Sequence, residues 1–464
     1  MMTETDTIAA IATAMSDSGI GIVRISGDKA IAVTDKIYHS KSGKKRLADV
    51  ESHTIHYGFI YDGDELVDEV MVAVMKAPNT YTKEDTVEID CHGGVLVMTK
   101  ILETVIRNGC RLAEPGEFTK RAFLNGRIDL SKAEAVMDLI HSKNEFAMKA
   151  SVNQLKGLVF DKVKALRDDI LYEIAFIESA IDDPEHISLD GYREKLEQKV
   201  LSVKGDIKKL IDSADNGKLL KDGINTVIVG KPNVGKSSLL NLLVGEERAI
   251  VTSVAGTTRD VLEESIKLNG LGLNIIDTAG IRDTDDEVEK IGVEKARKYA
   301  DNADLIIYVV DASRELDEND IEIVKLISNK KVVVLLNKTD LEQMVNENEL
   351  MTLVSENKNL RIIKTSTKEN VGMDEFEDAI KDMFFGGEIV INDEIYITNG
   401  RHKEALFEAY ESMELVLHSL ADNMPEDFYS IDLLSAYAAL GRIIGEEVGE
   451  DVVNEIFSKF CMGK

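Results

Sequence analysis

A glycine-rich loop at residues 230–237 has the residue types and spacing best suited to chemistry in this chain. It reads G-x-x-x-x-G-K-S, follows the apolar run at 226–229 and precedes a helix-like run at 238–243. Gly230 and Gly235 let successive backbone N–H groups point at one anion, and the positive end of the following helix adds to the attraction. Lys236 would then reach the β and γ phosphates of a nucleotide, and Ser237 would ligate Mg²⁺. A glycine-rich turn that merely precedes a helix is the alternative.

Two further boxes decide between these interpretations. Asp-Thr-Ala-Gly at 277–280 ends a second apolar strand, where a carboxylate that holds Mg²⁺ and a glycine that senses the γ phosphate are expected. Asn-Lys-Thr-Asp at 337–340 ends a third. A carboxylate such as Asp340 accepts hydrogen bonds from both N1–H and the 2-amino group of guanine, whereas adenine has no such donor pair. The predicted nucleotide is therefore GTP.

The remaining boxes follow in the expected order. Ser-Thr-Lys at 366–368 suits the loop that closes over the base, and the box at 256–260 supplies Thr258 as a second hydroxyl for Mg²⁺. The predicted nucleotide-binding residues are Asn233, Val234, Gly235, Lys236, Ser237, Ser238, Thr252, Ser253, Val254, Ala255, Gly256, Thr257, Thr258, Asp277, Thr278, Ala279, Gly280, Asn337, Lys338, Asp340, Ser366, Thr367 and Lys368. Ile281 stands where related enzymes have a glutamine that orients water, so catalysis needs help from elsewhere.

The composition limits the classes of protein to which the chain could belong. With 55 Lys and Arg against 85 Asp and Glu, the net charge of -30 argues against a large general nucleic-acid footprint. Three cysteines cannot build a disulfide framework, which favours a cytoplasmic protein. No run is long and apolar enough to span a membrane, and the acidic start is unlike a signal peptide, so no membrane partner is expected.

The chain divides into regions of different periodicity, and the predicted fold is multidomain α/β and α+β. Residues 1–120 alternate strand candidates with a helix after Gly94, which predicts an α+β domain. Residues 121–218 are helical, with a stretch at 193–214 whose apolar spacing fits a helical bundle. In 219–385, strands alternate with helices, which predicts a Ras-like domain with a doubly wound, mostly parallel sheet. Residues 386–464 are helical again, so the nucleotide domain is predicted to be inserted into a discontinuous helical domain.

This order of parts resembles the MnmE (TrmE) family of tRNA-modification GTPases over the full length. The most specific marks are Gly-Ile-Val-Arg-Ile-Ser-Gly at 21–27, His-Gly-Gly at 92–94, the run from Pro115 to Gly126, and the terminal Phe-Cys-Met-Gly-Lys at 460–464.

The resemblance implies a homodimer that binds a tetrahydrofolate derivative, 5,10-methylene or 5-formyl, between its N-terminal domains. It implies an FAD-dependent partner, MnmG (GidA), in a heterotetramer or larger complex that adds an aminomethyl or carboxymethylaminomethyl group to C5 of the wobble uridine of certain tRNAs. The family's folate positions fall on Arg24, Glu88, Arg127 and Lys464. Charge makes these plausible, since a pterin edge suits a carboxylate and the anionic folate tail suits Arg or Lys. The alternative is that each of these residues is an ordinary charged surface residue without a role in folate binding.

The resemblance also supports a hypothesis for catalysis without the glutamine. A K⁺ ion held by Asn233 and by backbone oxygens near Thr252, Val254 and Thr257 would neutralise charge developing between the β and γ phosphates. Glu289 would position water as general acid/base. The alternatives are a loop-capping amide for Asn233 and a solvated carboxylate in a first helical turn for Glu289.

Cys461 lies four residues from the end, where a thiolate favoured by Lys464 could face the folate and tRNA site as a catalytic group. An inert role is equally open, and the residues after it fit a prenylation signal poorly. The GTPase boxes alone would fit a second function, a switch in ribosome assembly or at a membrane, and the N-terminal domain could be a dimerisation module only. The terminal motif favours the modification enzyme.

Overall fold

The structure is a computed structural model that describes residues 6–41, 43, 45–188, 190–246, 264–268, 271–276, 303–327, 330–345, 350–352, 357, 359–385 and 395–464. The chain forms two compact units, each discontinuous in sequence. The first holds residues 1–137, 155–175 and 434–464, and the second holds 138–154 and 176–433.

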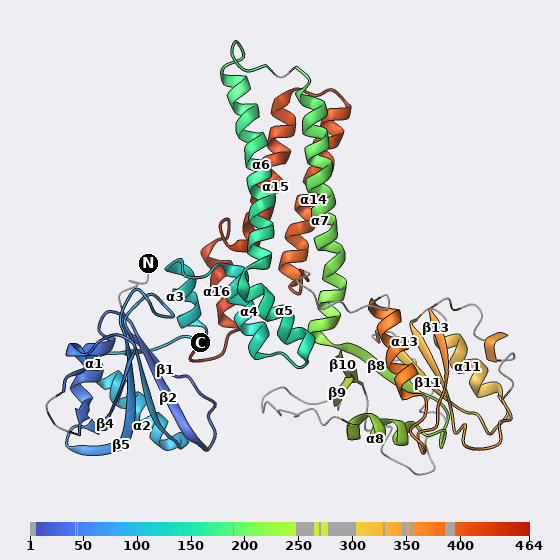
Figure 1. The fold of residues 1–464 in the computed structure, drawn as a ribbon, viewed down its shortest axis with the longest axis horizontal. Coiled ribbons are helices and arrows are strands. Elements are labelled where there is room, and N and C mark those ends of the chain that lie inside the picture. The colour runs from blue at the N-terminus through green and yellow to red at the C-terminus, as the bar shows by residue number, and fades with distance from the viewer. Residues whose placement is uncertain are drawn as a thin grey trace. The chain divides into compact units, whose positions relative to one another are not determined.

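A mixed sheet forms the N-terminal part of the first unit (Figure 1). Its strand order among the described residues is β3-β4-β5-β6-β2-β1-β7, antiparallel except for β1 with β7. Helices α1 (Ala30–Ile37) and α2 (Val95–Arg107) contribute buried side chains to a core with Ile25, Val72 and Ile89. The strands are β1 (Ile8–Ile11), β2 (Ser18–Ser26), β3 (Tyr38–Ser40), β4 (Thr54–Asp62), β5 (Glu65–Met75), β6 (Thr86–Gly93) and β7 (Arg111–Leu112).

The first unit also contains helices that pack with the C-terminal end of the chain. Leu130, at the start of α4 (Leu130–Ile140), packs with Phe457 of α16 (Glu450–Ser458) and with Phe460 beyond it. The short helix α3 (Glu117–Leu124) begins after Gly116, where an added Cβ would lie 2.6 Å from the carbonyl oxygen of Phe457. The C-terminal segment therefore packs closely against the segment that follows the N-terminal sheet.

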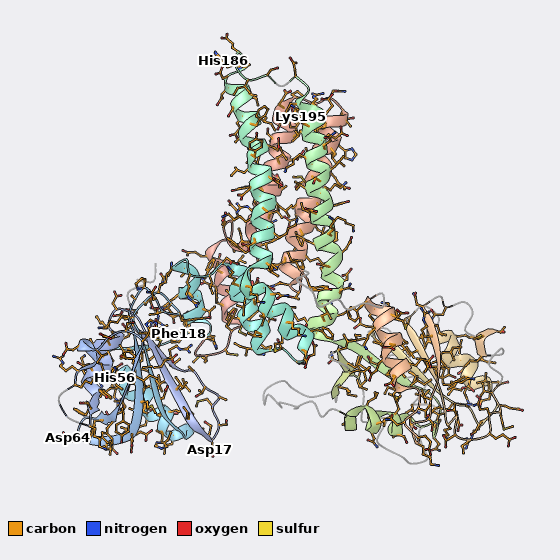
Figure 2. All side chains as sticks on the ribbon, viewed as in Figure 1. Asp17, His56, Asp64, Phe118, His186 and Lys195 are labelled. Atoms are coloured by element: carbon orange, nitrogen blue, oxygen red, sulfur yellow. The ribbon has the colours of Figure 1, made fainter. Side chains whose placement is uncertain are left out.

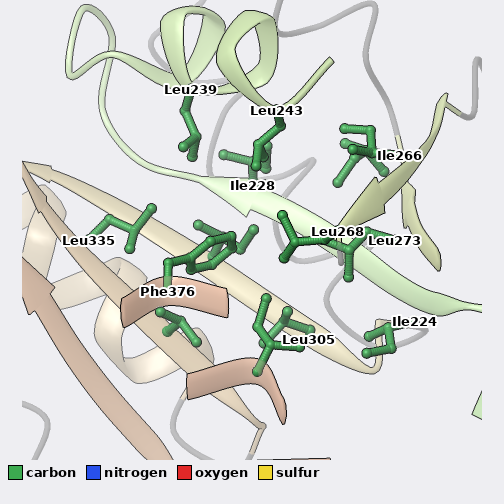
Figure 3. Close-up of a cluster of buried hydrophobic side chains, with 14 of the residues drawn as sticks. Ile224, Ile228, Leu239, Leu243, Ile266, Leu268, Leu273, Leu305, Leu335 and Phe376 are labelled. Carbon is green, nitrogen blue, oxygen red and sulfur yellow. The ribbon is translucent and has the colours of Figure 1, made fainter. Parts of the chain in front are cut away.

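A mostly parallel sheet forms the nucleotide-binding part of the second unit. Its strand order is β13-β12-β11-β8-β10-β9, and the pair β9 and β10 is antiparallel. One face packs against α8 (Lys236–Glu246) and α13 (Met373–Phe385) (Figure 3), and the other against α11 (Glu318–Ile327). Helices cover both faces because the strands are apolar on both sides. The strands are β8 (Ile224–Val229), β9 (Glu264–Leu268), β10 (Leu271–Ile275), β11 (Leu305–Asp311), β12 (Val332–Asn337) and β13 (Leu360–Lys364).

In the second unit, one long helix precedes this sheet in the sequence and another follows it. Lys204 of α7 (Tyr192–Asp222) pairs with Glu414 of α14 (Gly400–Ala421) at 2.8 Å. The nucleotide-binding sheet is thus inserted between two helices that pack together. Three further helices among the described residues are α5 (Glu145–Lys156), α6 (Leu158–Asp182) and α15 (Glu426–Ile444), and α6 and α15 each have residues in both units.

The predicted fold class is confirmed: α+β at the N-terminus, helices split by an inserted α/β domain, and a mostly parallel sheet. The domain boundaries at 120, 218 and 385 stay predictions. No helix among the described residues combines the length and hydropathy that a membrane crossing requires.

Candidate functional site

The phosphate loop runs from the end of β8 to the first turn of α8, and its shape requires glycine at two positions. Gly230 has φ +150°, and a Cβ there would lie 2.4 Å from the carbonyl oxygen of Val309. Gly235 has φ +108°, and its Cβ would lie 2.2 Å from Nδ2 of Asn337. Both positions combine a conformation that side chains rarely adopt with a close neighbour. The loop is therefore built for glycine, as its spacing predicts.

Lys236 extends back over this loop. Its Nζ donates to the carbonyl oxygens of Gly230 and Lys231, at 2.7 Å each. Burial lowers the pKa of its ammonium to about 8, because the charged form is poorly solvated there. Among the described residues only carbonyl oxygens hold this buried cation, which makes it suited to an anionic ligand.

The Asn-Lys-x-Asp box is tied directly to the phosphate loop. Asn337 is buried at the end of β12, and its Nδ2 donates to the carbonyl oxygen of Val234 at 2.9 Å. Its Oδ1 accepts from the backbone N–H of Thr367 at 3.1 Å. Lys338 donates to the carbonyl oxygen of Asn233 at 2.8 Å. The amide of Asn337 thus joins the phosphate loop to the loop predicted to close over the base.

Asp340 faces that second loop. Its Oδ1 accepts from Oγ of Ser366 at 2.8 Å, and Nζ of Lys368 lies 3.9 Å from its Oδ2. Thr339 donates through Oγ1 to the carbonyl oxygen of Thr365 at 3.0 Å. The structure therefore brings together the described residues of the phosphate loop and of the two loops that are predicted to contact the base.

Two buried acids near this site were missed by the sequence analysis. Asp311 ends β11, directly opposite Asn337 in the register, and accepts from Nζ of Lys338 at 2.6 Å. Burial alone would raise the pKa of Asp311, but hydrogen bonds from Lys338 and Ser313 outweigh it and lower the pKa. Asp320 of α11 binds Nζ of Lys231 at 2.6 Å. The position of Asp311 at the carboxyl end of an apolar strand was a usable signal, whereas nothing local marks Asp320.

Several predicted residues lie outside the described residues. They are Thr252, Ser253, Val254, Ala255, Gly256, Thr257, Thr258, Asp277, Thr278, Ala279, Gly280, Ile281 and Glu289. Their roles stay predictions.

The first unit holds a second cluster of predicted site residues. Arg24 of β2 and Glu88 of β6 are paired in the antiparallel register, and Nε of Arg24 donates to Oε1 of Glu88 at 2.7 Å. The Arg24 guanidinium lies 5.8 Å from the ring centre of Phe118, which is labelled in Figure 2, and also donates to the carbonyl oxygen of Gly463 at 3.1 Å. The arginine thus links the sheet, α3 and the C-terminal tail.

The tail reaches the sheet through Gly463. At φ +81°, a Cβ there would lie 2.3 Å from the carbonyl oxygen of Ile11 in β1. Burial and the neighbouring Arg24 lower the pKa of Lys464 below its usual range, in spite of Glu88. Cys461 is exposed, and its carbonyl oxygen accepts from the N–H of Gly116 at 3.3 Å. Three of the four predicted folate residues, Arg24, Glu88 and Lys464, are therefore close together.

Arg127, the fourth, contacts a different aromatic ring. Its guanidinium lies 4.7 Å from the ring centre of Tyr81. Tyr81 in turn packs against the small core that includes Phe118, and its hydroxyl is 3.0 Å from Oγ1 of Thr119. Arg127 is linked to the Arg24 cluster through this core, and no direct contact between the two arginines is described.

A doubly wound sheet, a phosphate loop and an Asn-Lys-x-Asp box joined by Asn337 define a GTP-binding protein of the P-loop class. Family profiles match 7–127, described as "GTP-binding protein TrmE N-terminus", and 130–461, described as "MnmE helical domain". The chain belongs to the MnmE (TrmE) family of tRNA modification GTPases.

Full-length relatives agree with this assignment. The chain is 58% identical to the tRNA modification GTPase MnmE of Lachnoclostridium phytofermentans, over 99% of this chain and 100% of that protein. Proteins of the same name from Alkaliphilus oremlandii and Clostridioides difficile are 51% and 50% identical, each over 99% of both chains. Among solved structures, the G domain of the T. maritima FeoB iron transporter is 23% identical over 34% of this chain and 98% of that chain, with a TM-score of 0.25.

Proposed function

We propose that this protein is a K⁺-dependent GTPase that works with an FAD-dependent MnmG (GidA) partner to modify C5 of the wobble uridine of certain tRNAs. The one-carbon unit would come from a tetrahydrofolate derivative, and the complex would be a cytoplasmic heterotetramer or larger. The main support for GTPase activity is the side-chain amide of Asn337. It forms hydrogen bonds to both the phosphate loop and the loop predicted to close over the base. Membership of the MnmE family supports the tRNA substrate.

The phosphates of GTP would lie over the loop that Gly230 and Gly235 shape. The ammonium group of Lys236 is already held there by carbonyl oxygens, and it would bind the β and γ phosphates. Asp340 and Ser366, which contact each other, would read the guanine edge. The hydroxyls of Ser237, at the start of α8, and of Thr258 suit Mg²⁺, which prefers oxygen ligands.

The side-chain oxygen of Asn233 would bind the monovalent cation, and the backbone of this residue is fixed in place. It has φ +63°, a conformation that costs energy outside glycine, and its carbonyl oxygen is held by Lys338 at 2.8 Å. The remaining oxygens would come from Thr252, Val254 and Thr257. A bound K⁺ would supply positive charge between the β and γ phosphates, and Glu289 would position the attacking water.

The sheet face that bears Arg24 and Glu88 supports both the folate site and the homodimer. Side chains at paired positions on neighbouring strands share one face. Two such rows cross β2, β6, β5 and β4: Arg24, Glu88, Ala73 and Ile55 form one, and Ile22, Asp90, Met71 and Tyr57 form the other.

In these rows Ile55, Tyr57 and Met71 are exposed apolar side chains next to the charged cluster. A second copy would cover them, so that a pterin bound at Glu88 would lie between the two N-terminal domains. The anionic tail of the folate would pair with Arg24, Lys464 and Arg127. The exposed thiol of Cys461 lies on the tail that Arg24 holds, where it would be available to act on substrate as a catalytic group.

GTP hydrolysis in K⁺ and in Na⁺ at equal ionic strength tests the first part, with Asn233→Ala and, as a control, Asn241→Ala on the exposed side of α8. We expect K⁺ stimulation that Asn233→Ala loses and Asn241→Ala keeps. Equal rates in both salts would contradict the cation mechanism.

Nucleoside mass spectrometry of tRNA incubated with the protein, MnmG, GTP and folate tests the second part. Appearance of the modified wobble uridine supports it. K⁺-stimulated hydrolysis without modification would favour the alternative, a GTPase switch in ribosome assembly or at a membrane.

A further inference from the structure

A groove lined by lysine and arginine side chains lies at the edge of the N-terminal sheet, and its lining residues lie outside β2 and β6, the strands that bear Arg24 and Glu88. It measures about 940 Å³, and α1, β3 and the segment leading to the 3₁₀ helix Leu47–Asp49 contribute to its walls. A smaller hollow of about 360 Å³ shares Lys45 and Arg46 with it. Among the described residues, four cations line the groove: Lys36, Lys45, Arg46 and Lys76. Lys36 lies in α1, Lys45 and Arg46 are adjacent before the 3₁₀ helix, and Lys76 follows β5, so the cations come from three segments.

The lysines keep most of their donor capacity. Lys36 donates one bond to the carbonyl oxygen of Asn108 at 3.1 Å, and Lys76 donates one to that of Ala48 at 3.3 Å. An ammonium has three N–H donors, and a neutral carbonyl leaves its charge uncompensated. Lys45 contributes a further positive charge, which together with burial lowers the pKa of His56 in the adjoining hollow; burial is the larger cause.

The carboxylates of the groove are partly occupied by the protein itself. Asp35 accepts from Nε of Arg46 at 3.0 Å and from the N–H of Leu47 at 2.6 Å. Asp85 accepts from the N–H of Ala77 at 2.9 Å. The side chain of Arg46 remains 73% exposed, so its outer nitrogens face solvent beside Asp35. Asp28 is the third carboxylate among the described residues that line the groove, and Asp49 and Glu51 line the adjoining hollow.

This local charge stands out against the chain as a whole. The net charge is -30, yet residues 41–46 read Lys-Ser-Gly-Lys-Lys-Arg, four cations in six positions. Basic runs of this kind are typical of nucleic-acid contacts. A polyanion would be repelled by most of an acidic surface, and therefore would be guided to the few places where cations gather.

We propose that this groove binds the phosphodiester backbone of RNA. The inference rests on the proposed function, which makes tRNA the substrate, and it gives the acidic chain a contact of its own with that substrate. Lysine ammoniums are suited to phosphates as point charges, and they fix position without reading sequence. The chain has no tryptophan and few aromatic residues, which favours backbone contacts over base stacking.

Fluorescence anisotropy of labelled tRNA with the full-length protein tests the groove. The variant replaces Lys36, Lys45 and Lys76 by Gln. A control with the same net charge replaces Lys149, Lys164 and Lys195, three exposed helix lysines outside the groove. We expect roughly a tenfold or greater loss of tRNA affinity for the groove variant only. The slope of log K against log salt concentration should also become smaller by about 2, since each phosphate contact contributes about 0.7 to 0.9 to that slope. GTP hydrolysis should be unchanged in both.

If the tRNA affinity of the groove variant is unchanged, or if both variants lose affinity equally, the proposal that the groove binds RNA is wrong. Modification of tRNA by the wild type with MnmG is measured in parallel. If the wild type modifies tRNA and the groove variant binds it equally well, the groove inference fails and the proposed function stands. If the wild type neither binds nor modifies tRNA, both fail.

Discussion

Nζ of Lys231 in the phosphate loop lies 2.6 Å from a carboxylate oxygen of Asp320, which is 1% exposed. The other oxygen of Asp320 accepts from the hydroxyl of Tyr308 at 2.6 Å, and Tyr308 is itself buried in β11. The backbone carbonyl of Lys231 accepts from Lys236. Lys236, which is predicted to bind phosphate, is therefore positioned by a loop that is anchored to α11 and β11.

The first prediction concerns Lys231→Met. It leaves the buried carboxylate of Asp320 without its cation, and breaking such a pair costs about 3 to 5 kcal/mol. Because the Lys231 side chain is 19% exposed, we expect the lower end, with weaker GTP binding. Chemical denaturation with and without GTP measures both effects.

Lys381→Met is the matched control, since Lys381 pairs with the exposed Asp378 at 3.4 Å and should change stability by less than about 1 kcal/mol. Adding Asp320→Asn to Lys231→Met should recover part of the loss. Equal stability of the two single variants would show that the buried pair does not anchor the loop.

The second prediction concerns the amide that joins the two nucleotide loops. Asn337→Ala removes bonds to the carbonyl oxygen of Val234 and the N–H of Thr367, both at a buried site. We expect GTP affinity to fall about 10- to 100-fold, since each lost bond of this kind costs about 1 to 3 kcal/mol. Asn337→Asp keeps the acceptor for Thr367 but places a second acceptor 2.9 Å from the carbonyl oxygen of Val234 at a buried site, so its affinity should fall at least as far. Titration with a fluorescent GTP analogue tests this order, and wild-type affinity for Asn337→Ala would refute it.

The sequence predicted those parts of the site that local spacing defines. Gly230, Lys236, Asn337 and Asp340 belong to boxes whose chemistry depends on neighbours within a few residues. The anchor between Lys231 and Asp320 joins residues 89 positions apart, and the sequence carries no local mark of it. Such a pair depends on how α11 packs against the sheet, which periodicity does not determine.

One helix shows the same limit. The sequence predicted a helix over 193–214, but α7 continues to Asp222 through Asp215, Asn216 and Gly217, which are weak helix formers. A Cβ on Gly217 would lie 2.2 Å from the carbonyl oxygen of Ile397. Gly217 therefore allows the backbone at Ile397 to approach α7 closely. Helix propensity alone would place the end of the helix near this glycine, whereas the tertiary contact explains why glycine lies inside it.

The third prediction concerns the C-terminal tail. Gly463→Ala would place a Cβ 2.3 Å from the carbonyl oxygen of Ile11 at a φ of +81°, so the tail should lose its position on β1. Because Arg24 binds the carbonyl oxygen of Gly463, we expect folate binding to weaken by about tenfold or more, an effect of one to a few kcal/mol. GTP hydrolysis should not change. Isothermal titration with 5-formyltetrahydrofolate measures the binding.

Gly63→Ala is the control for the tail variant. Gly63 also has positive φ, at +61°, but nothing lies within 4 Å of an added Cβ. Backbone strain alone would affect both variants, whereas displacement of the tail affects only Gly463→Ala. If both variants bind folate like the wild type, the tail does not contribute to that site.

The fourth prediction concerns a buried charge network at α3. Arg121 binds Glu84 at 3.0 Å and Glu117 at 2.9 Å, and Arg111 also binds Glu117 at 2.7 Å. Burial alone would raise the pKa of Glu117, but hydrogen bonds from Arg111, the N–H of Glu114 and Arg121 together lower it. Its stabilising contribution is therefore complete above the unfolded pKa of about 4.3 and is lost as pH falls through the lower folded pKa.

Arg121→Met should consequently destabilise α3 strongly at pH 7, and this free-energy cost should shrink as pH falls through the lowered pKa of Glu117, where that carboxylate takes up a proton. At neutral pH the cost should be about 3 kcal/mol, because two nearly buried carboxylates lose a partner. Hydrogen exchange of peptides spanning α3 measures this locally, which avoids assuming that the multidomain chain unfolds in one step. Arg107→Met, which removes a more exposed pair with Asp62, should leave α3 unchanged. A cost for Arg121→Met that does not shrink at low pH would mean that packing, and not charge, is what Arg121 contributes.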